Sequence, residues 1–133
     1  MNSDNWSMQN LRYCSLEWLE DNIVLAKFNN GLTIDKEAAL EITHAILQFT
    51  NQQPFKIVID LQNIVWSITE EANEIFLSFP EYIKNRMKSV FLVNTLAIRL
   101  LIRFYQKNKL KDQNSKIFSS MAEGLNWIKE ETN

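Results

Sequence analysis

The stretch KIVIDLQNIVWSITEEANEIF (residues 56–76) decides the fold. Residues 56–61 form a nearly continuous run of β-branched and aliphatic side chains, which is typical of a strand covered on both faces. Ser67 and Glu70 have the spacing of a capping box, so a helix is expected to begin there. The apolar residues that follow recur at helical spacing, at Ala72, Ile75, Phe76 and Phe79. A buried strand that leads into an amphipathic helix indicates an α/β domain.

The chain on either side of this stretch continues the alternation. An N-terminal β-hairpin is expected first, because two short apolar runs flank the turn residues 20–22. The expected strands are residues 13–19, 23–28, 56–61, 90–93 and 117–118, and the expected helices are residues 35–49, 67–79, 95–107 and 120–128. The sequence therefore predicts a mostly parallel sheet of about five strands with about four helices.

Size and composition favour one domain. The chain has 133 residues, of which 46% are hydrophobic, and this suits a single domain over residues 11–133 after a flexible polar N-terminus, residues 1–10. A single cysteine, Cys14, argues against a disulfide framework and a structural zinc site. We find no apolar run long enough for a transmembrane segment and no secretory signal, so a cytoplasmic location is expected.

Charge is unevenly distributed along the chain. Residues 1–83 carry four basic and twelve acidic side chains, whereas residues 84–116 carry nine basic side chains and one acidic side chain. Such asymmetry is suited to an acidic partner, or to the acidic half of a second copy in a homodimer. The sequence pI of about 5.4 and the lack of an aromatic and basic platform give no support to nucleic-acid binding.

Several motifs resemble a known fold family. They are residues 57–61 with Ile64 three residues on, residues 30–34, residues 67–72 and residues 122–128. Together with the element order they resemble the STAS domain of anti-sigma-factor antagonists, and more closely the uncharacterised bacterial SpoIIAA-like proteins described as STAS/SEC14-like. The resemblance covers roughly residues 13–130 and implies a SpoIIAA-like (STAS) fold.

The same resemblance bears on regulation. In the antagonists, the middle strand leads to an Asp-Ser-Ser-Gly element whose second serine is phosphorylated. This chain has Ile68, Thr69, Glu70 and Glu71 at those positions. The resemblance thus implies that Glu70 replaces the phosphoacceptor, as a fixed carboxylate at the positive end of a helix. Acidic residues in a first turn also stabilise a helix without any signalling role, so both interpretations stay open.

The expected helix at residues 95–107 is more apolar than contact with one face of a sheet requires. Arg99 and Arg103 lie on its narrow polar stripe, one helical turn apart. The surplus apolar surface is expected to pack on a neighbouring helix, a second subunit or a lipophilic ligand. The residues of this candidate interface are Leu96, Leu100 and Tyr105.

No catalytic constellation emerges from the sequence. His44 falls on the polar face of its helix, and Cys14 has no histidine or basic residue beside it in sequence. Glu70, Glu71 and Glu74 crowd one helix start, which favours a solvated face over a metal or acid-base site. We therefore expect a protein that is not an enzyme and that uses no cofactor and no metal.

Two functional hypotheses remain. The first is a STAS-like regulatory or protein-interaction module without the usual phosphoacceptor serine, whose candidate binding or regulatory residues are Ser67, Thr69, Glu70, Arg99 and Arg103. Its partner would be another protein or a second copy of the chain. The alternative is a carrier or sensor of a lipophilic anionic small molecule, with the helix at residues 95–107 lining an apolar pocket and Arg99 or Arg103 meeting the anionic group.

Overall fold

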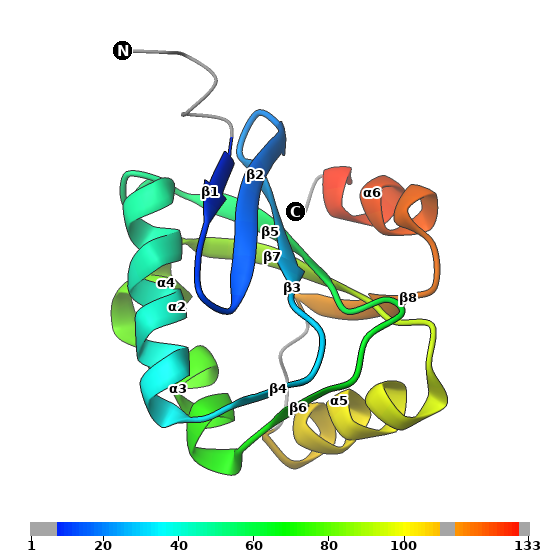
Figure 1. The fold of residues 1–133 in the computed structure, drawn as a ribbon. Coiled ribbons are helices and arrows are strands. Elements are labelled where there is room, and N and C mark those ends of the chain that lie inside the picture. Colours follow the sequence, from blue (N-terminus) through cyan, green and yellow to red (C-terminus); the bar gives the residue numbers. More distant parts are fainter. Residues whose placement is uncertain (1–7, 110–113, 131–133) are drawn as a thin grey trace.

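A computed structural model describes residues 8–109 and 114–130, with side chains described for residues 11–103 and 114–130. Its main sheet has six strands in the order β1-β2-β3-β5-β7-β8 (Figure 1). The strands are β1 (Met8–Asn10), β2 (Cys14–Glu20), β3 (Ile23–Phe28), β5 (Phe55–Asp60), β7 (Arg86–Leu92) and β8 (Ser115–Phe118). The pairs β1–β2 and β2–β3 are antiparallel, and the pairs β3–β5, β5–β7 and β7–β8 are parallel. The expected hairpin and the mostly parallel sheet are thus confirmed.

Strand β5 lies inside the sheet, paired with β3 on one side and with β7 on the other. Successive side chains of a strand point to opposite faces of the sheet. Ile57 and Val58 are consecutive residues of β5, and both are almost completely buried. Ile57 packs in the larger of two hydrophobic cores, and Val58 packs in the smaller one. Both faces of the sheet are therefore covered, as the aliphatic run at residues 56–61 predicts.

The helices are α2 (Lys36–Phe49), α3 (Glu70–Ser78), α4 (Pro80–Asn85), α5 (Leu96–Lys109) and α6 (Met121–Lys129). Buried residues of α2, α3, α4 and α5 belong to the larger core, whereas Ile128 of α6 belongs to the smaller core on the other face. In Figure 1, α6 stands apart from α2, α3 and α4. The two faces of the sheet therefore differ: four helices share one core, and α6 packs over the other.

Local sequence explains most helix boundaries. Asp35 caps α2 by accepting a hydrogen bond from the backbone N–H of Ala38 (2.9 Å), and Ser120 caps α6 by accepting one from Glu123 (3.2 Å). Pro80 occupies the first turn of α4, where a missing N–H costs nothing. The caps Asp35 and Ser120 agree with the helix starts that the sequence analysis expects at residues 35 and 120.

The structure corrects two expectations about the architecture. Residues 8–10, expected within a flexible N-terminus, form β1 and pair with β2, so the sheet gains a sixth strand. A second sheet, which the sequence did not indicate, joins β4 (Leu32–Ile34) to β6 (Trp66–Ile68) in parallel. All three of these strands have only three residues, which is too short for an alternating pattern to be recognised.

Candidate functional site

The first candidate surface lies where β6 leads into α3. Thr69 is the N-cap of α3, and its hydroxyl oxygen accepts a hydrogen bond from the backbone N–H of Ala72 (3.1 Å). Ser67, which the sequence predicted as the cap, lies instead in β6, with its hydroxyl 2.9 Å from that of Thr33. The prediction is wrong because the pairing of β4 with β6 holds Ser67 in an extended conformation. Glu70 follows the cap and is exposed, so its carboxylate lies at the positive end of the helix.

The second candidate surface is the beginning of α5. Ile98 and Ile102 are buried in the larger core, whereas Leu96 and Leu100 are 69% and 55% exposed. The side chain of Tyr105 lies outside the residues whose side chains are described. One face of α5 therefore packs on its own domain, and the described part of the chain leaves Leu96 and Leu100 uncovered.

Val65 is a third exposed apolar residue of this region, and a hydrogen-bonded pair of asparagines connects its segment to the segment that precedes α5. Asn63 and Asn94 are joined by two hydrogen bonds, from the backbone N–H of Asn63 (2.9 Å) and from the side-chain amide of Asn94 (2.7 Å). Val65 and Leu96 each lie two residues beyond a member of this pair, and Val65 is 74% exposed. We call Val65, Leu96 and Leu100 the α5 surface.

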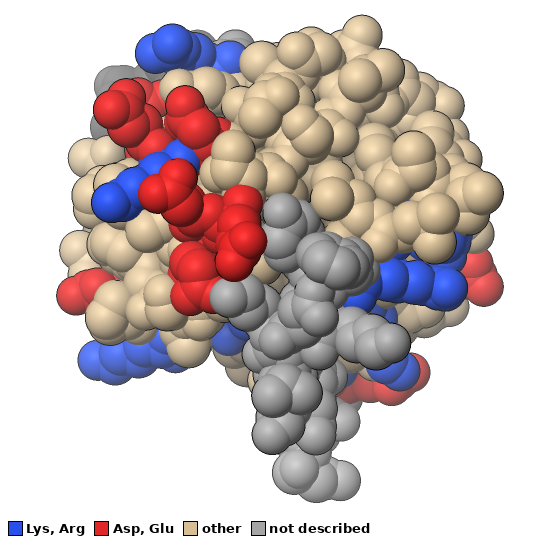
Figure 2. All heavy atoms as spheres, turned by 90° about the horizontal axis from the view of Figure 1, so that it is seen from below, with Lys and Arg blue, Asp and Glu red and all other residues tan. Residues whose placement is uncertain are grey.

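Charged and uncharged areas are separated on this side of the molecule. Figure 2 shows a band of acidic side chains on the side where Figure 1 places α2 and α3, and a wide uncharged area on the side of α5. Glu70 and Glu71 are exposed acidic residues in the first turn of α3. On this face an acidic area and an uncharged area therefore lie side by side.

The two arginines of α5 do not act as a pair. Arg99 is half-buried, and its Nη2 donates to the backbone carbonyl oxygen of Val93 (3.3 Å). Arg103 is exposed and lines an open groove with residues of β8 and α6. Arg99 therefore helps to hold the segment that leads into α5, whereas Arg103 faces another surface.

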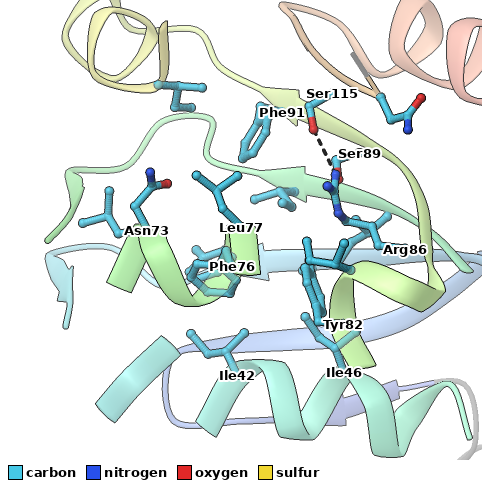
Figure 3. A pocket seen from close by; sticks show the side chains of 18 of the residues that line it. Ile42, Ile46, Asn73, Phe76, Leu77, Tyr82, Arg86, Ser89, Phe91 and Ser115 are labelled. Atoms are coloured by element: carbon cyan, nitrogen blue, oxygen red, sulfur yellow. Dashed lines mark hydrogen bonds between the residues drawn. The ribbon is translucent and has the colours of Figure 1, made fainter. Parts of the chain in front are cut away.

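A separate apolar cavity lies between the sheet and the helices, with a volume of about 350 Å³. Its floor includes two small residues of the sheet, Ala26 in β3 and Ser89 in β7. Phe76 of α3, Tyr82 of α4 and Ile42 of α2 form part of its walls (Figure 3). The volume is roughly ten times the space that one water molecule occupies in the liquid, so it exceeds an ordinary packing defect.

A cation lies at one end of the cavity. Arg86 is the one charged side chain among the described residues that line it. Its Nη1 donates to the hydroxyl oxygens of Ser89 (2.6 Å) and Ser115 (3.0 Å), and its guanidinium carbon lies 6.0 Å from the centre of the Tyr82 ring. These contacts fix the position of the guanidinium group.

Two buried donors lie along the same cavity. Trp66 Nε1 and Asn73 Nδ2 are inaccessible to solvent and have no hydrogen-bond partner among the described residues. Figure 3 places Asn73 and Arg86 on opposite sides of the cavity. A buried donor without a partner costs free energy, so each such group calls for an explanation.

The sequence did not indicate this cavity. It predicted an apolar pocket beside Arg99 or Arg103, but the described lining includes Ile102 as its residue from α5 and neither of these arginines. Arg86 and Ser89 belong to residues 84–116, the basic segment of the sequence, and their contact with Ser115 depends on the pairing of β7 with β8. Ser89, a polar residue directly before the apolar run at residues 90–93, was the signal that could have been used.

Other reactive residues fit structural roles. His44 is exposed, and its ring contacts that of Phe79 edge to face at 5.3 Å between centroids. Cys14 is buried, and burial raises the pKa of its thiol to about 12, which disfavours the reactive thiolate. The described residues contain no group of three or more His, Cys, Asp or Glu side chains that could bind a metal ion. No helix in those residues is long and apolar enough to cross a membrane.

Comparison with solved structures identifies the fold. The phosphorylated form of SpoIIAA, a Bacillus cell fate determinant, has 13% sequence identity to this chain, covers 87% of it and 99% of its own length, and gives a TM-score of 0.54. An uncharacterised protein of the DUF3478 family from Shewanella loihica PV-4, described as having a SpoIIAA-like fold, has 15% identity, covers 90% of this chain and 97% of its own, and gives a TM-score of 0.59. The expected SpoIIAA-like (STAS) fold is confirmed.

Sequence comparisons add a family without a known activity. Among curated proteins no match was found. The model of one protein family, Domain of unknown function (DUF7793), matches residues 17–132. Because this match spans most of the domain, the chain belongs to the DUF7793 family.

Proposed function

We propose that this domain is a non-enzymatic, STAS-like interaction module that binds a protein partner through the α5 surface and the adjacent start of α3. The observation that carries the proposal is the exposure of Val65, Leu96 and Leu100 within one region. Exposed apolar residues that gather beside charged ones mark interaction surfaces, because burial against a partner removes them from water.

The charge of the partner follows from the neighbouring residues. Glu70 and Glu71 are exposed at the positive end of α3, so a basic group on the partner would meet fixed carboxylates. The proposed module has no phosphorylation switch at this helix start: the Thr69 hydroxyl caps the helix, and Glu70 takes the position of the phosphoacceptor in the resembling antagonists. Its binding would accordingly be controlled by the availability of the partner.

A capture experiment with the full chain tests this function. We expect cells that make the protein to contain a partner that is captured by the wild type and by Met87→Asp, a control at another exposed apolar residue. Leu96→Asp and Leu100→Asp should abolish capture, and Glu70→Lys should weaken it. Equal capture by all variants, or no specific capture by the wild type, would reject the proposal.

An experiment on the purified protein tests whether the partner is a second copy of the chain. If the partner is a second copy, sedimentation equilibrium will show a dimer that Leu100→Asp converts to a monomer, while Met87→Asp stays dimeric. A monomeric wild type assigns the α5 surface to a different protein and contradicts the homodimer.

The apolar cavity favours a second function, the binding of a lipophilic anionic molecule. The expected location beside Arg99 or Arg103 is replaced by the space lined by Ala26, Ser89 and Arg86. Its volume of about 350 Å³ falls within the range of roughly 300–1,000 Å³ for small-molecule sites. This second function requires at least that an uncharged apolar probe binds in the cavity.

A further inference from the structure

We propose that Asn30 is a site of non-enzymatic deamidation and that Val65 controls the reaction by holding both reacting groups in the folded protein. Asn30 and Gly31 form the only Asn-Gly pair of the chain. Both residues are exposed in the turn between β3 and β4. The inference concerns a chemical modification and does not depend on the partner proposed above.

The reaction uses groups of these two consecutive residues. The backbone nitrogen of Gly31 loses its proton and attacks Cγ of Asn30, the Cγ–Nδ2 bond breaks, and the amide nitrogen leaves as ammonia. Water then opens the resulting five-membered imide at either carbonyl group. Opening at Cγ gives aspartate, whereas opening at the backbone carbonyl gives a β-aspartyl linkage. The balance is one water consumed and one ammonia released, with no oxidation or reduction.

Glycine at position 31 favours the ring closure. A side chain on the residue after an asparagine obstructs the approach of its backbone nitrogen to Cγ, and glycine has none. Gly31 has a φ of +83°, and no described atom lies within 4 Å of the place that a Cβ would occupy. The surroundings of Gly31 therefore leave room for the imide.

In the folded protein, Val65 holds both reacting groups. Its backbone N–H donates to Oδ1 of Asn30 (2.6 Å), and its carbonyl oxygen accepts a hydrogen bond from the N–H of Gly31 (2.7 Å). The first bond restricts rotation of the Asn30 amide toward Gly31. The second bond holds the proton that Gly31 has to lose. The attack therefore requires that these two hydrogen bonds open.

The two bonds lie at the beginning of the small sheet. Gly31 directly precedes β4, and Val65 directly precedes β6 (Figure 1). Each of these strands has three residues, and Val65 is 74% exposed. Hydrogen bonds at an exposed end of short strands open locally at a lower free energy than those of a buried sheet. Asn30 is thus expected to react through local opening while the main sheet stays folded.

Deamidation changes this edge of the molecule. Both products carry a carboxylate in place of the neutral amide of Asn30, so a negative charge is added beside Val65. The β-aspartyl linkage also adds one carbon atom to the backbone between residues 30 and 31. This displaces the N–H of Gly31 relative to the carbonyl group of Val65, so the β-aspartyl product weakens the pairing where β4 and β6 begin.

Timed incubation of the full chain in mildly alkaline buffer tests the site. Peptide mapping by mass spectrometry locates the conversion of amide to acid, and methylation by a protein isoaspartyl methyltransferase detects the β-aspartyl product. We expect conversion at Asn30 to be roughly tenfold or more slower in the folded chain than in the same chain unfolded in urea, because two hydrogen bonds must open first. Asn30→Gln should remove the fast conversion in urea.

Two substitutions of Val65 isolate its role. Val65→Pro removes the N–H that donates to Asn30, so the folded variant should deamidate about fivefold or more faster than the wild type. Val65→Ala is the matched control, because it keeps the backbone N–H and carbonyl group and should react at the wild-type rate. A thermal melt checks the folding of both variants.

A measurement on the wild type replaces Val65→Pro if that variant does not fold. At urea concentrations below the unfolding transition, conversion at Asn30 and hydrogen exchange of the Gly31 amide should increase together. Slow conversion at Asn30 in the fully unfolded chain would reject the site. Control by Val65 is rejected by equal rates in the folded and unfolded chains, by equal rates for folded Val65→Pro and Val65→Ala, or by exchange at Gly31 that increases without conversion at Asn30.

Discussion

The ammonium nitrogen of Lys88 lies 2.9 Å from the backbone carbonyl oxygen of Trp127, so a side chain of the sheet is hydrogen-bonded to the end of α6. The same nitrogen donates to the carbonyl oxygen of Glu130 (2.9 Å) and lies 4.6 Å from the centre of the Trp127 ring. Lys88 is 4% exposed. A residue that contributes to the basic segment of the sequence thus caps a helix C-terminus, where carbonyl groups need donors and favour a cation.

Replacing this lysine tests its role in docking α6. We expect Lys88→Met to lower the free energy of unfolding by about 1–3 kcal/mol, because two carbonyl oxygens lose their donor. Lys129→Met is the control: Lys129 pairs with Glu20 at a half-exposed position, and such a pair contributes about 0–1 kcal/mol. Urea denaturation measures both values, and a loss for Lys88→Met no larger than that for Lys129→Met would contradict the assigned role.

The same lysine predicts a pH dependence. Burial lowers the pKa of Lys88 in the folded protein, with the charges of Lys56 and Lys116 acting in the same direction and that of Glu130 opposing them. Between the folded pKa and about 10.5 the unfolded state binds more protons, so stability from this group increases as pH rises. The free-energy difference between wild type and Lys88→Met should therefore shift in favour of the wild type from pH 7 to pH 10. A shift in the other direction would contradict the prediction.

Cys14 predicts the opposite trend in alkali. Burial raises the pKa of its thiol to about 12, whereas the same thiol in the unfolded chain has the ordinary cysteine pKa of 9.0. Its contribution to stability is complete below pH 9 and is lost as pH rises toward 12; between pH 8 and pH 10 the loss is about 1.4 kcal/mol. Comparison with Cys14→Ala by urea denaturation isolates this loss, and parallel pH profiles would refute it.

The cap of α3 can be assigned by two single substitutions. Thr69→Ala should lower the free energy of unfolding by about 1 kcal/mol, because the backbone N–H of Ala72 loses its acceptor. Ser67→Ala should change it by less than about 0.5 kcal/mol, since its hydroxyl pairs with Thr33 at an exposed position. Thermal denaturation distinguishes them, and a larger effect at Ser67 would restore the capping box that the sequence indicated.

Gly124 tests how closely α6 approaches the sheet. A Cβ at this position would meet Val90 Cγ1 at 2.8 Å, closer than non-bonded carbon atoms approach in proteins. Helix propensity alone would make Gly124→Ala stabilising by about 1 kcal/mol. Because of the contact with Val90, we expect a destabilisation of about 1–3 kcal/mol instead, measured by urea denaturation. A more stable variant would show that the helix can move away without cost.

The sequence by itself determined the alternation of the longer strands and helices and the mostly parallel sheet, but not the three-residue strands β1, β4 and β6. The aliphatic run at residues 57–61 required burial on both faces, and capping residues such as Asp35 and Ser120 act within a few residues of where they stand. Because these signals lie within a few consecutive residues, they can be recognised in a single sequence. The same holds for the apolar surplus of α5, although periodicity could not tell the buried Ile98 and Ile102 from the exposed Leu96 and Leu100.

Only the tertiary structure decided the candidate sites. Arg86, Ser89 and Ser115 meet because β7 pairs with β8, and the cavity beside them arises from small residues on strands that are distant in sequence. The structure also changes the interpretation of the basic residues 84–116 as a surface for an acidic partner. Lys88, Arg86 and Arg99 donate hydrogen bonds to groups of their own domain. A count of charges along the chain cannot reveal this, since whether a cation faces water or a carbonyl group depends on which elements pack together.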